Sequence, residues 1–210
     1  MEGYIDRSEA GSVLAEKLQQ YADRKDVIVL ALPRGGVPVA YEIAKKLHVP
    51  LDVFIVRKLG VPSHSELAMG AIAMNKVTVF NQDILAESRI AQSDIDPVIE
   101  SEYKELQRRE KKYRGTRPFP DLKNKIIILV DDGIATGATM RVAIKALRQQ
   151  KPAHIIVAVP VVSKDVYQQF LELADKIISP LLPEYLFAVG QWYESFPQTT
   201  DEEVIALLNK

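Results

Sequence analysis

The sequence predicts an α/β protein in which helices flank a mostly parallel central sheet. Apolar runs rich in β-branched residues recur at 27–32, 51–56, 126–130 and 154–159, as expected of strands buried on both faces. Segments with helical spacing alternate with these runs, an order typical of parallel sheets. Two of the runs end in loops that combine glycine with charged residues, and open α/β sheets bind ligands at the carboxyl ends of their strands.

The length of 210 residues favours one domain that spans residues 1–210. We expect its core at about 25–160. A helix expected at Asp6–Ala22 covers this core without contributing chemistry, and residues 180–210 form a small C-terminal hood. Apolar residues make up 47% of the chain, which is enough for a sizeable core.

The composition argues against several classes of function. A formal net charge of −1 gives no bulk reason to expect nucleic acid or an acidic membrane as a partner. The chain has no cysteine, which excludes disulfides, a cysteine nucleophile and a thiolate metal site. The N-terminal stretch lacks the apolar core of a signal peptide, and no apolar run is long enough to span a bilayer. We therefore expect a cytoplasmic protein.

The most informative stretch runs from Lys125 to Met140. An apolar run ends abruptly in Asp131 and Asp132, small residues and hydroxyls follow, and a helical pattern then begins near Met140. The stretch thus joins the end of a buried strand to the start of a helix. A helix N-terminus offers unpaired N–H groups and the positive end of the helix dipole, and small residues let an anion reach them. The stretch therefore predicts a phosphate site.

The acidic pair needs a different partner from the phosphate. Two carboxylates held ~4 Å apart repel by about 4 kcal/mol at an effective dielectric near 20, and they repel a phosphate as well. Such a pair favours hydroxyl donors or a cation. A ligand with a phosphate at one end and a diol nearby, with or without Mg²⁺, would satisfy both halves of the stretch.

The motif VDDGIATGAT closely resembles the phosphoribosyl diphosphate (PRPP) signature of type I phosphoribosyltransferases. The resemblance implies that Asp131 and Asp132 are catalytic and hold the ribose hydroxyls, directly or as ligands of Mg²⁺. It implies that the 5′-phosphate lies in the loop of Ala135, Thr136, Gly137, Ala138 and Thr139. The loop is not a Walker A motif, because no Gly-Lys-Ser/Thr follows its glycines. We expect a valine at Gly137 to block phosphate entry without unfolding the chain.

A second strand–loop–helix junction lies at Arg34, Gly35 and Gly36. The glycines permit close backbone approach, and the arginine can donate a bidentate pair of hydrogen bonds. The resemblance assigns this loop to the pyrophosphate. Arg57 and Lys58, expected at the end of the next strand, would also meet the leaving pyrophosphate; the alternative is a solvated pair at a strand end.

The remaining segments carry weaker signals. Residues Leu59–Met69 indicate a long mobile loop, which in the family would close over PRPP and exclude water. A hairpin is expected around Asn75-Lys76, and a long charged helix from Ser93 or Asp94 to Tyr113. In the hood, Trp192 and Tyr193 are the candidates for stacking on an acceptor base, although clustered aromatic residues more often belong to a core or an interface.

The resemblance implies transfer of the 5-phosphoribosyl group from PRPP to a nitrogenous acceptor, with a nucleobase as the expected class and Mg²⁺ as the cofactor. Hypoxanthine-guanine members of the family carry an aspartate where this chain has Ala135, which argues against that specificity. The alternatives are a non-catalytic regulator that binds PRPP and, more distantly, a Mg²⁺-dependent phosphohydrolase. The acceptor, the proton donor and the oligomeric state stay open, a homodimer included.

Overall fold

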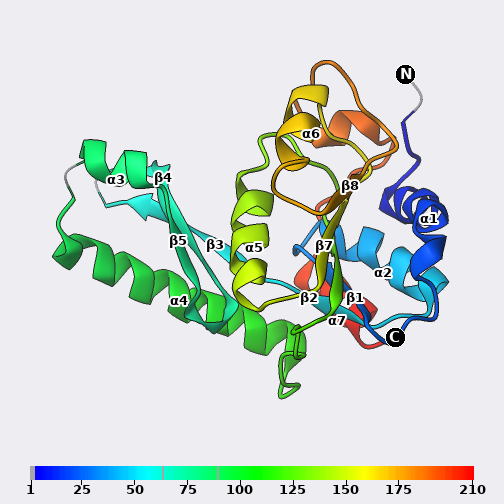
Figure 1. Ribbon diagram of the computed structural model, residues 1–210, viewed down its shortest axis with the longest axis horizontal. Helices are drawn as coiled ribbons and strands as arrows, with labels where there is room; N and C mark the ends of the chain where they lie inside the picture. The colour runs from blue at the N-terminus through cyan, green and yellow to red at the C-terminus, as the bar shows by residue number, and fades with distance from the viewer. Residues whose placement is uncertain (1–2, 63, 89) are drawn as a thin grey trace.

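The computed structural model describes residues 3–62, 64–88 and 90–210, and its centre is a five-stranded parallel sheet (Figure 1). The strands run in the order β2-β1-β6-β7-β8, which confirms the predicted α/β class. They are β1 (Val27–Ala31), β2 (Leu51–Val53), β6 (Ile126–Val130), β7 (His154–Ala158) and β8 (Lys176–Ile178). Every residue of β1 and β6 is buried, as expected of central strands covered on both faces.

Helices cover both faces of this sheet (Figure 1). Helices α1 and α2 lie on one side and α5 on the other. The bounds of the core helices are α1 (Arg7–Lys17), η1 (Gln19–Tyr21), α2 (Gly36–Leu47), α5 (Ala138–Gln149), α6 (Lys164–Phe170), η3 (Val189–Trp192) and α7 (Asp201–Leu208). The chain leaves β1 in one direction along the sheet and β6 in the other, so the two central strands form a topological switch point, where open α/β sheets bind ligands.

A second, antiparallel sheet and a long helix form an arm that projects from one side of the core (Figure 1). The arm consists of β3 (Val56–Val61), β4 (His64–Ala73), η2 (Met74–Lys76), β5 (Thr78–Phe80), α3 (Gln82–Ser88) and α4 (Gln92–Arg114). The predicted hairpin around η2 and the predicted long helix are both confirmed. The buried Arg114 of α4 forms an ion pair with Asp52 of β2, which ties the base of the arm to the core. A second ion pair of Arg114, with Glu110, lies within α4.

The expectation of a mobile loop at Leu59–Met69 was wrong. The segment belongs to the antiparallel hairpin of β3 and β4, with irregular register near Gly60. Leu59, Val61 and Met69 are buried, so apolar packing stabilises the hairpin. In the sequence, the glycine, proline and serine residues of the segment favoured a loop instead. Ser63, which the expected loop included, lies outside the described residues.

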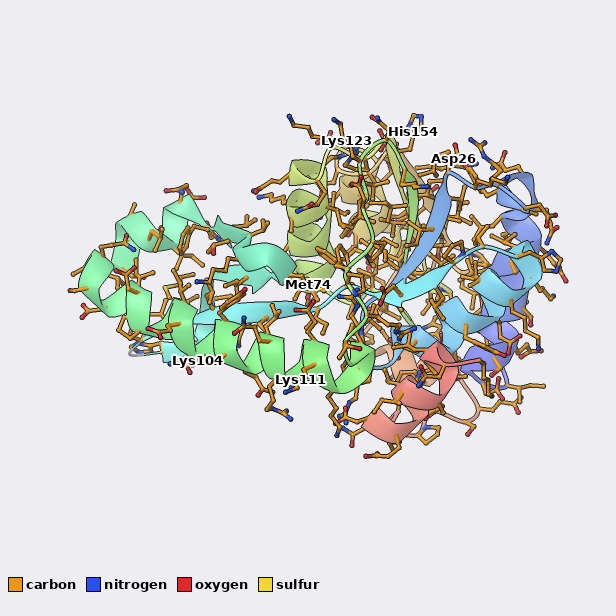
Figure 2. The ribbon with its side chains drawn as sticks, turned by 90° about the horizontal axis from the view of Figure 1, so that it is seen from below. Asp26, Met74, Lys104, Lys111, Lys123 and His154 are labelled. Carbon is orange, nitrogen blue, oxygen red and sulfur yellow. The ribbon has the colours of Figure 1, made fainter. Side chains whose placement is uncertain are left out.

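The ends of the parallel strands identify the edge of the sheet on which a ligand would bind. Figure 2 labels Asp26, Lys123 and His154 together at the edge where β1, β6 and β7 begin. The carboxyl ends of these strands, and the loops that follow them, lie at the opposite edge. In the part of the chain that the structure describes, no helix is both long and apolar enough to cross a membrane.

Candidate active site

Two predicted ligand loops meet at the carboxyl ends of β1 and β6, which are hydrogen-bonded neighbours with Ala31 opposite Val130. A Cβ atom added to Gly35 would lie 2.0 Å from Asp132 Oδ2, and one added to Gly36 would lie 2.9 Å from the Cα of Asp131. Only glycine allows the first loop to lie this close to the acidic pair. The structure thus brings together residues that are about 100 positions apart in the sequence.

The two carboxylates differ in their surroundings. Asp131 Oδ1 accepts a hydrogen bond from the backbone N–H of Asp132 over 2.9 Å. Burial, followed by the charge of Asp132, raises the pKa of Asp131 well above its usual range. Burial raises the pKa of Asp132 as well, but the neighbouring guanidinium of Arg7 opposes this rise. A cation or hydroxyl donors would therefore stabilise the ionised form of the pair, mainly at Asp131.

Arg7, in the first turn of α1, is the contact that the sequence did not reveal. Its Nε donates to Asp132 Oδ2 over 2.9 Å, and its Nη2 lies 2.9 Å from the same oxygen. Its Nη1 donates to the carbonyl of Pro197 over 2.7 Å. The helix expected to be a plain cover therefore supplies a buried cation to the site. The side chain of Asp6 caps the start of this helix.

The predicted phosphate loop leads directly into α5. Gly137 is the N-cap of α5 and, having no side chain, leaves the N–H groups of the first helical turn without a side-chain cap. Thr136, Ala138 and Thr139 are exposed, and Ala135 is half-buried. The free helix N-terminus and the two hydroxyls are therefore open to an anion, next to the acidic pair.

The expectation for a valine at Gly137 is corrected by the backbone. Gly137 has φ +77°, the left-handed region that side-chain-bearing residues avoid. A Cβ atom there would also lie 2.7 Å from the ring of Phe170, which is fully buried. A larger residue at Gly137 therefore strains the fold as well as the loop.

Arg34 of the first loop faces a cluster at the start of α7. Its Nη1 lies 3.7 Å from Asp201 Oδ1. The same carboxylate accepts hydrogen bonds from Tyr113 over 2.5 Å and from Lys112 over 2.6 Å, both at the end of α4. Asp201 therefore links the predicted pyrophosphate loop to α4 and α7, with the contact to Arg34 as its longest.

Arg57 and Lys58 lie in β3 of the arm rather than at the end of a core strand, so that expectation of position was wrong. Arg57 forms an ion pair with Glu102 of α4, with its Nε 2.7 Å from Glu102 Oε2. Lys58, the next residue of the strand, borders the cavity that Arg57 and Glu102 line. Unlike Arg57, it also lines a cavity of about 100 Å³ together with Ala138 and Thr139 of α5, as the alternation of strand residues allows. Of the two cations, only Lys58 is therefore brought beside the phosphate loop.

The C-terminal hood packs against Asp132 and Gly133 of the acidic motif. Val189 lies so close that a Cβ atom on Gly133 would be 2.5 Å from Val189 Cγ1. The Tyr193 hydroxyl donates to the backbone carbonyl of Asp132 over 2.6 Å, and burial raises the pKa of this phenol, which therefore stays protonated. The ring of Tyr193 is buried among aromatic neighbours, whereas Trp192 is half-buried.

The hood also carries aromatic rings that sequence reasoning did not single out. Tyr185 is 75% exposed and Phe187 is 85% exposed, in the segment that precedes Val189. Tyr193 instead packs the hood onto Asp132 through its hydroxyl. The available signal was their position in the predicted hood, but nothing in the sequence distinguished exposed rings from buried ones.

The acidic pair fits the demands of Mg²⁺ in a limited way. Carboxylate oxygens are suitable donors, and Mg²⁺ is commonly held by one or two carboxylates together with substrate phosphates and water. Among the described residues, no group of three or more histidine or acidic side chains could form a complete metal cage. Since Arg7 already occupies Asp132, Asp131 is the residue best placed to hold Mg²⁺ that arrives with a phosphorylated ligand.

Known proteins resemble this chain over its whole length. A Mycobacterium tuberculosis (strain ATCC 25618 / H37Rv) protein, Rv0571c, provisionally named as a phosphoribosyl transferase, is 44% identical over 210 residues, which are 100% of this chain and 47% of that protein. The chain thus spans about half the length of the curated relatives it matches.

Solved structures and a family match complete the comparison. The crystal structure of TT1426 from Thermus thermophilus has a TM-score of 0.85 and 37% identity, covering 98% of this chain and 97% of that one. The AQ2163 protein from Aquifex aeolicus shares the fold alone, with a TM-score of 0.51, 12% identity, and coverage of 88% of this chain and 78% of that one. The phosphoribosyl transferase domain matches residues 8–177, which is most of the chain. The chain therefore belongs to the phosphoribosyl transferase domain family.

Proposed function

We propose that the protein is a phosphoribosyltransferase that moves the 5-phosphoribosyl group of PRPP to a nitrogenous acceptor and releases pyrophosphate. A nucleobase is the expected class of acceptor. The observation that carries the proposal is the meeting of an acidic pair with an uncapped helix N-terminus at the switch point of the sheet. The partners would be small molecules, with neither nucleic acid nor a membrane involved.

The proposed roles follow from the position of each loop. The N–H groups at the start of α5, with Thr136 and Thr139, would hold the 5′-phosphate. Asp131 and Asp132 would accept hydrogen bonds from the ribose hydroxyls, and Asp131 would be the main protein ligand of Mg²⁺. Arg34–Gly36 would hold the pyrophosphate, with Lys58 approaching from the arm side of α5. In this proposal residues 1–210 act as one unit, because α1, the hood and α7 all contact the two loops.

The chemistry asks the protein mainly for position and charge. A nitrogen of the acceptor forms a bond to the anomeric carbon while the bond from that carbon to pyrophosphate breaks, and both electrons leave with the pyrophosphate. Bound Mg²⁺ would neutralise part of the charge on that leaving group. The Arg34 guanidinium would stabilise the same charge without moving far. Trp192 and the exposed rings of Tyr185 and Phe187 would be the candidates in the hood for stacking on a planar acceptor.

One observation favours a second candidate, a protein that binds PRPP without turning it over. Ala135 gives the phosphate loop no carboxylate that could take a proton from an acceptor base. Incubation with PRPP, Mg²⁺ and a panel of bases separates the candidates when pyrophosphate and nucleotide are both measured. Base-dependent release of both supports the transferase, and binding without turnover supports the second candidate. Base-independent hydrolysis would contradict both. Sedimentation of the same sample tests the prediction of a homodimer.

A further inference from the structure

The match to the phosphoribosyl transferase domain covers residues 8–177 and so does not include Arg7. The Arg7 side chain nevertheless donates a hydrogen bond to Asp132 of the acidic pair. Its side chain is 10% exposed, and that of Asp132 is 16% exposed. Three nitrogen atoms of the guanidinium group contact protein oxygens: Nε and Nη2 contact Asp132 Oδ2, and Nη1 contacts the carbonyl of Pro197. Such an arrangement holds a carboxylate by charge-assisted hydrogen bonds in a fixed orientation.

Two further contacts keep Arg7 itself in place. The ring of Phe196 lies 3.7 Å from the guanidinium carbon, so one face of the cation is covered. The backbone of α1 begins at Arg7, directly after the Asp6 cap, which fixes the point from which the side chain extends. A cation that is stacked on a ring and held by three contacts to the protein is poorly placed to turn toward a substrate. Its effect on a ligand would therefore pass through Asp132.

The geometry at Asp132 shows what this effect would be. Arg7 holds Oδ2 from the α1 side, and the backbone of Gly35 closes in on the same oxygen. Oδ1 stays outside the contact with Arg7. Without Arg7, the Asp132 carboxylate would lose both of its contacts with α1, beside the neighbouring carboxylate of Asp131. The Asp132 side chain would then be free to rotate, and a rotated carboxylate would no longer be aimed at a ribose hydroxyl.

We infer that Arg7 is a positioning residue that orients the Asp132 carboxylate to accept a ribose hydroxyl, which makes α1 part of the sugar site. This inference rests on the proposed function, because it requires a ribose 5-phosphate group beside the acidic pair. It assigns a specific task to an element whose first residue lies outside the matched domain. It also separates the acids: Asp132 recognises the sugar, and Asp131 is left for the metal.

The test compares two ligands in metal-free buffer with a chelator, so that no metal contributes. Isothermal titration gives the dissociation constants of inorganic phosphate and of ribose 5-phosphate for the full chain. Their ratio measures what the sugar adds to the phosphate. In Arg7→Gln this ratio should fall by about tenfold or more, as expected when the acceptor of a charge-assisted hydrogen bond is lost. Affinity for inorganic phosphate should stay within about twofold, because the α5 N-terminus is unchanged.

Matched variants separate positioning from folding. Arg7→Lys keeps the positive charge but loses the planar guanidinium group. It should therefore retain part of the preference for ribose 5-phosphate over inorganic phosphate that Arg7→Gln loses. A purely structural role would not place the two variants in this order. Phe196→Leu leaves Arg7 present but uncovers it, and it should give a smaller fall; this variant serves if Arg7→Gln does not fold. Arg24→Gln is the control, because Arg24 forms an exposed ion pair with Asp26 at the opposite edge of the sheet and should leave the ratio unchanged.

The outcomes distinguish this inference from the function beneath it. If the parent protein prefers ribose 5-phosphate and Arg7→Gln keeps the full preference, the inference about Arg7 is wrong while the proposed function stands. If the parent protein binds inorganic phosphate and ribose 5-phosphate equally, the proposed sugar site itself fails, and the role of Arg7 fails with it.

Discussion

Gly35→Ala probes the contact between the two ligand loops with the smallest change available. Gly35 has φ −59° and ψ −33°, a backbone conformation that alanine adopts without strain. The added Cβ atom would lie 2.0 Å from Asp132 Oδ2 and 2.7 Å from its Cγ. The carboxylate would have to move by more than about 1 Å to restore ordinary van der Waals contact. On its other side Arg7 already holds the same oxygen at 2.9 Å.

The expected loss of stability combines two costs. Overpacking at a close contact costs about 1–3 kcal/mol. Pulling the carboxylate away from Arg7 sacrifices a charge-assisted hydrogen bond, which contributes about 1.5–3 kcal/mol. The free energy of unfolding should therefore fall by about 2.5–6 kcal/mol. For a chain of this size, the melting temperature should fall by roughly 5–24 °C.

A double-mutant cycle with Asp132→Ala makes this prediction specific. Thermal and urea unfolding are measured for the parent, both single variants and the double variant. Once the Asp132 carboxylate is gone, the alanine at position 35 has room, and its cost should fall to about 0.5 kcal/mol or less. An equal cost of Gly35→Ala in both backgrounds would show that the two loops do not meet as described.

Three other predictions follow from the same geometry. The pKa of Asp131 is raised in the folded protein, so ionisation of this carboxyl group disfavours folding, and stability is lost as pH rises from the unfolded pKa toward the folded pKa. Asp131→Asn should therefore raise the free energy of unfolding at pH 7 by about 0.5–2 kcal/mol while weakening PRPP binding. A variant that is less stable than the parent in urea unfolding would contradict this prediction. Gly137→Ala should destabilise the fold by about 2–4 kcal/mol, from its positive φ and the clash with Phe170, and parental melting would refute it. Lys112, then Tyr113, lower the pKa of Asp201, so this carboxylate adds stability above its unfolded pKa that is lost as pH falls through the folded pKa. Asp201→Asn should cost about 0.5–1 kcal/mol at pH 7, and urea unfolding at successively lower pH should show this cost shrinking as the carboxylate of the parent protein is protonated.

The sequence was sufficient to predict features that depend on local patterns. The apolar runs of β1 and β6 are buried on both faces as expected, and the hairpin expected around Asn75-Lys76 forms between β4 and β5. The meeting of the two ligand loops also followed, because carboxyl ends of parallel strands share one edge of a sheet. These features need only the chain near each residue and the rules of sheet topology.

Contacts between distant side chains were beyond the reach of those patterns. Arg7 and Asp132 are 125 residues apart, and nothing near Arg7 marks it as different from any charged residue of a helix surface. The pairing of Arg34 with Asp201 was hidden for the same reason. Long-range ion pairs depend on how terminal helices dock, and sequence periodicity says which face of a helix is buried but not what it meets.

The hairpin of β3 and β4 was misjudged because turn-forming residues dominated the interpretation. Gly60, Pro62 and Ser65 suggested a loop, whereas the buried alternate positions Leu59 and Val61 carried the strand signal. That error also misplaced Arg57, which faces α4 instead of the site. Successive residues of a strand point to opposite faces, so Arg57 and Lys58 do not both face α5. Predicting the strand would therefore have indicated that only one of the two cations approaches α5.

A crystal structure of the protein with ribose 5-phosphate tests the central claim most directly. The account predicts that the phosphate lies on the backbone N–H groups at the start of α5, with the ribose hydroxyls within hydrogen-bond distance of Asp131 and Asp132. A sugar phosphate bound elsewhere on the molecule, with protein side chains filling the space between α5 and the acidic pair, would contradict it.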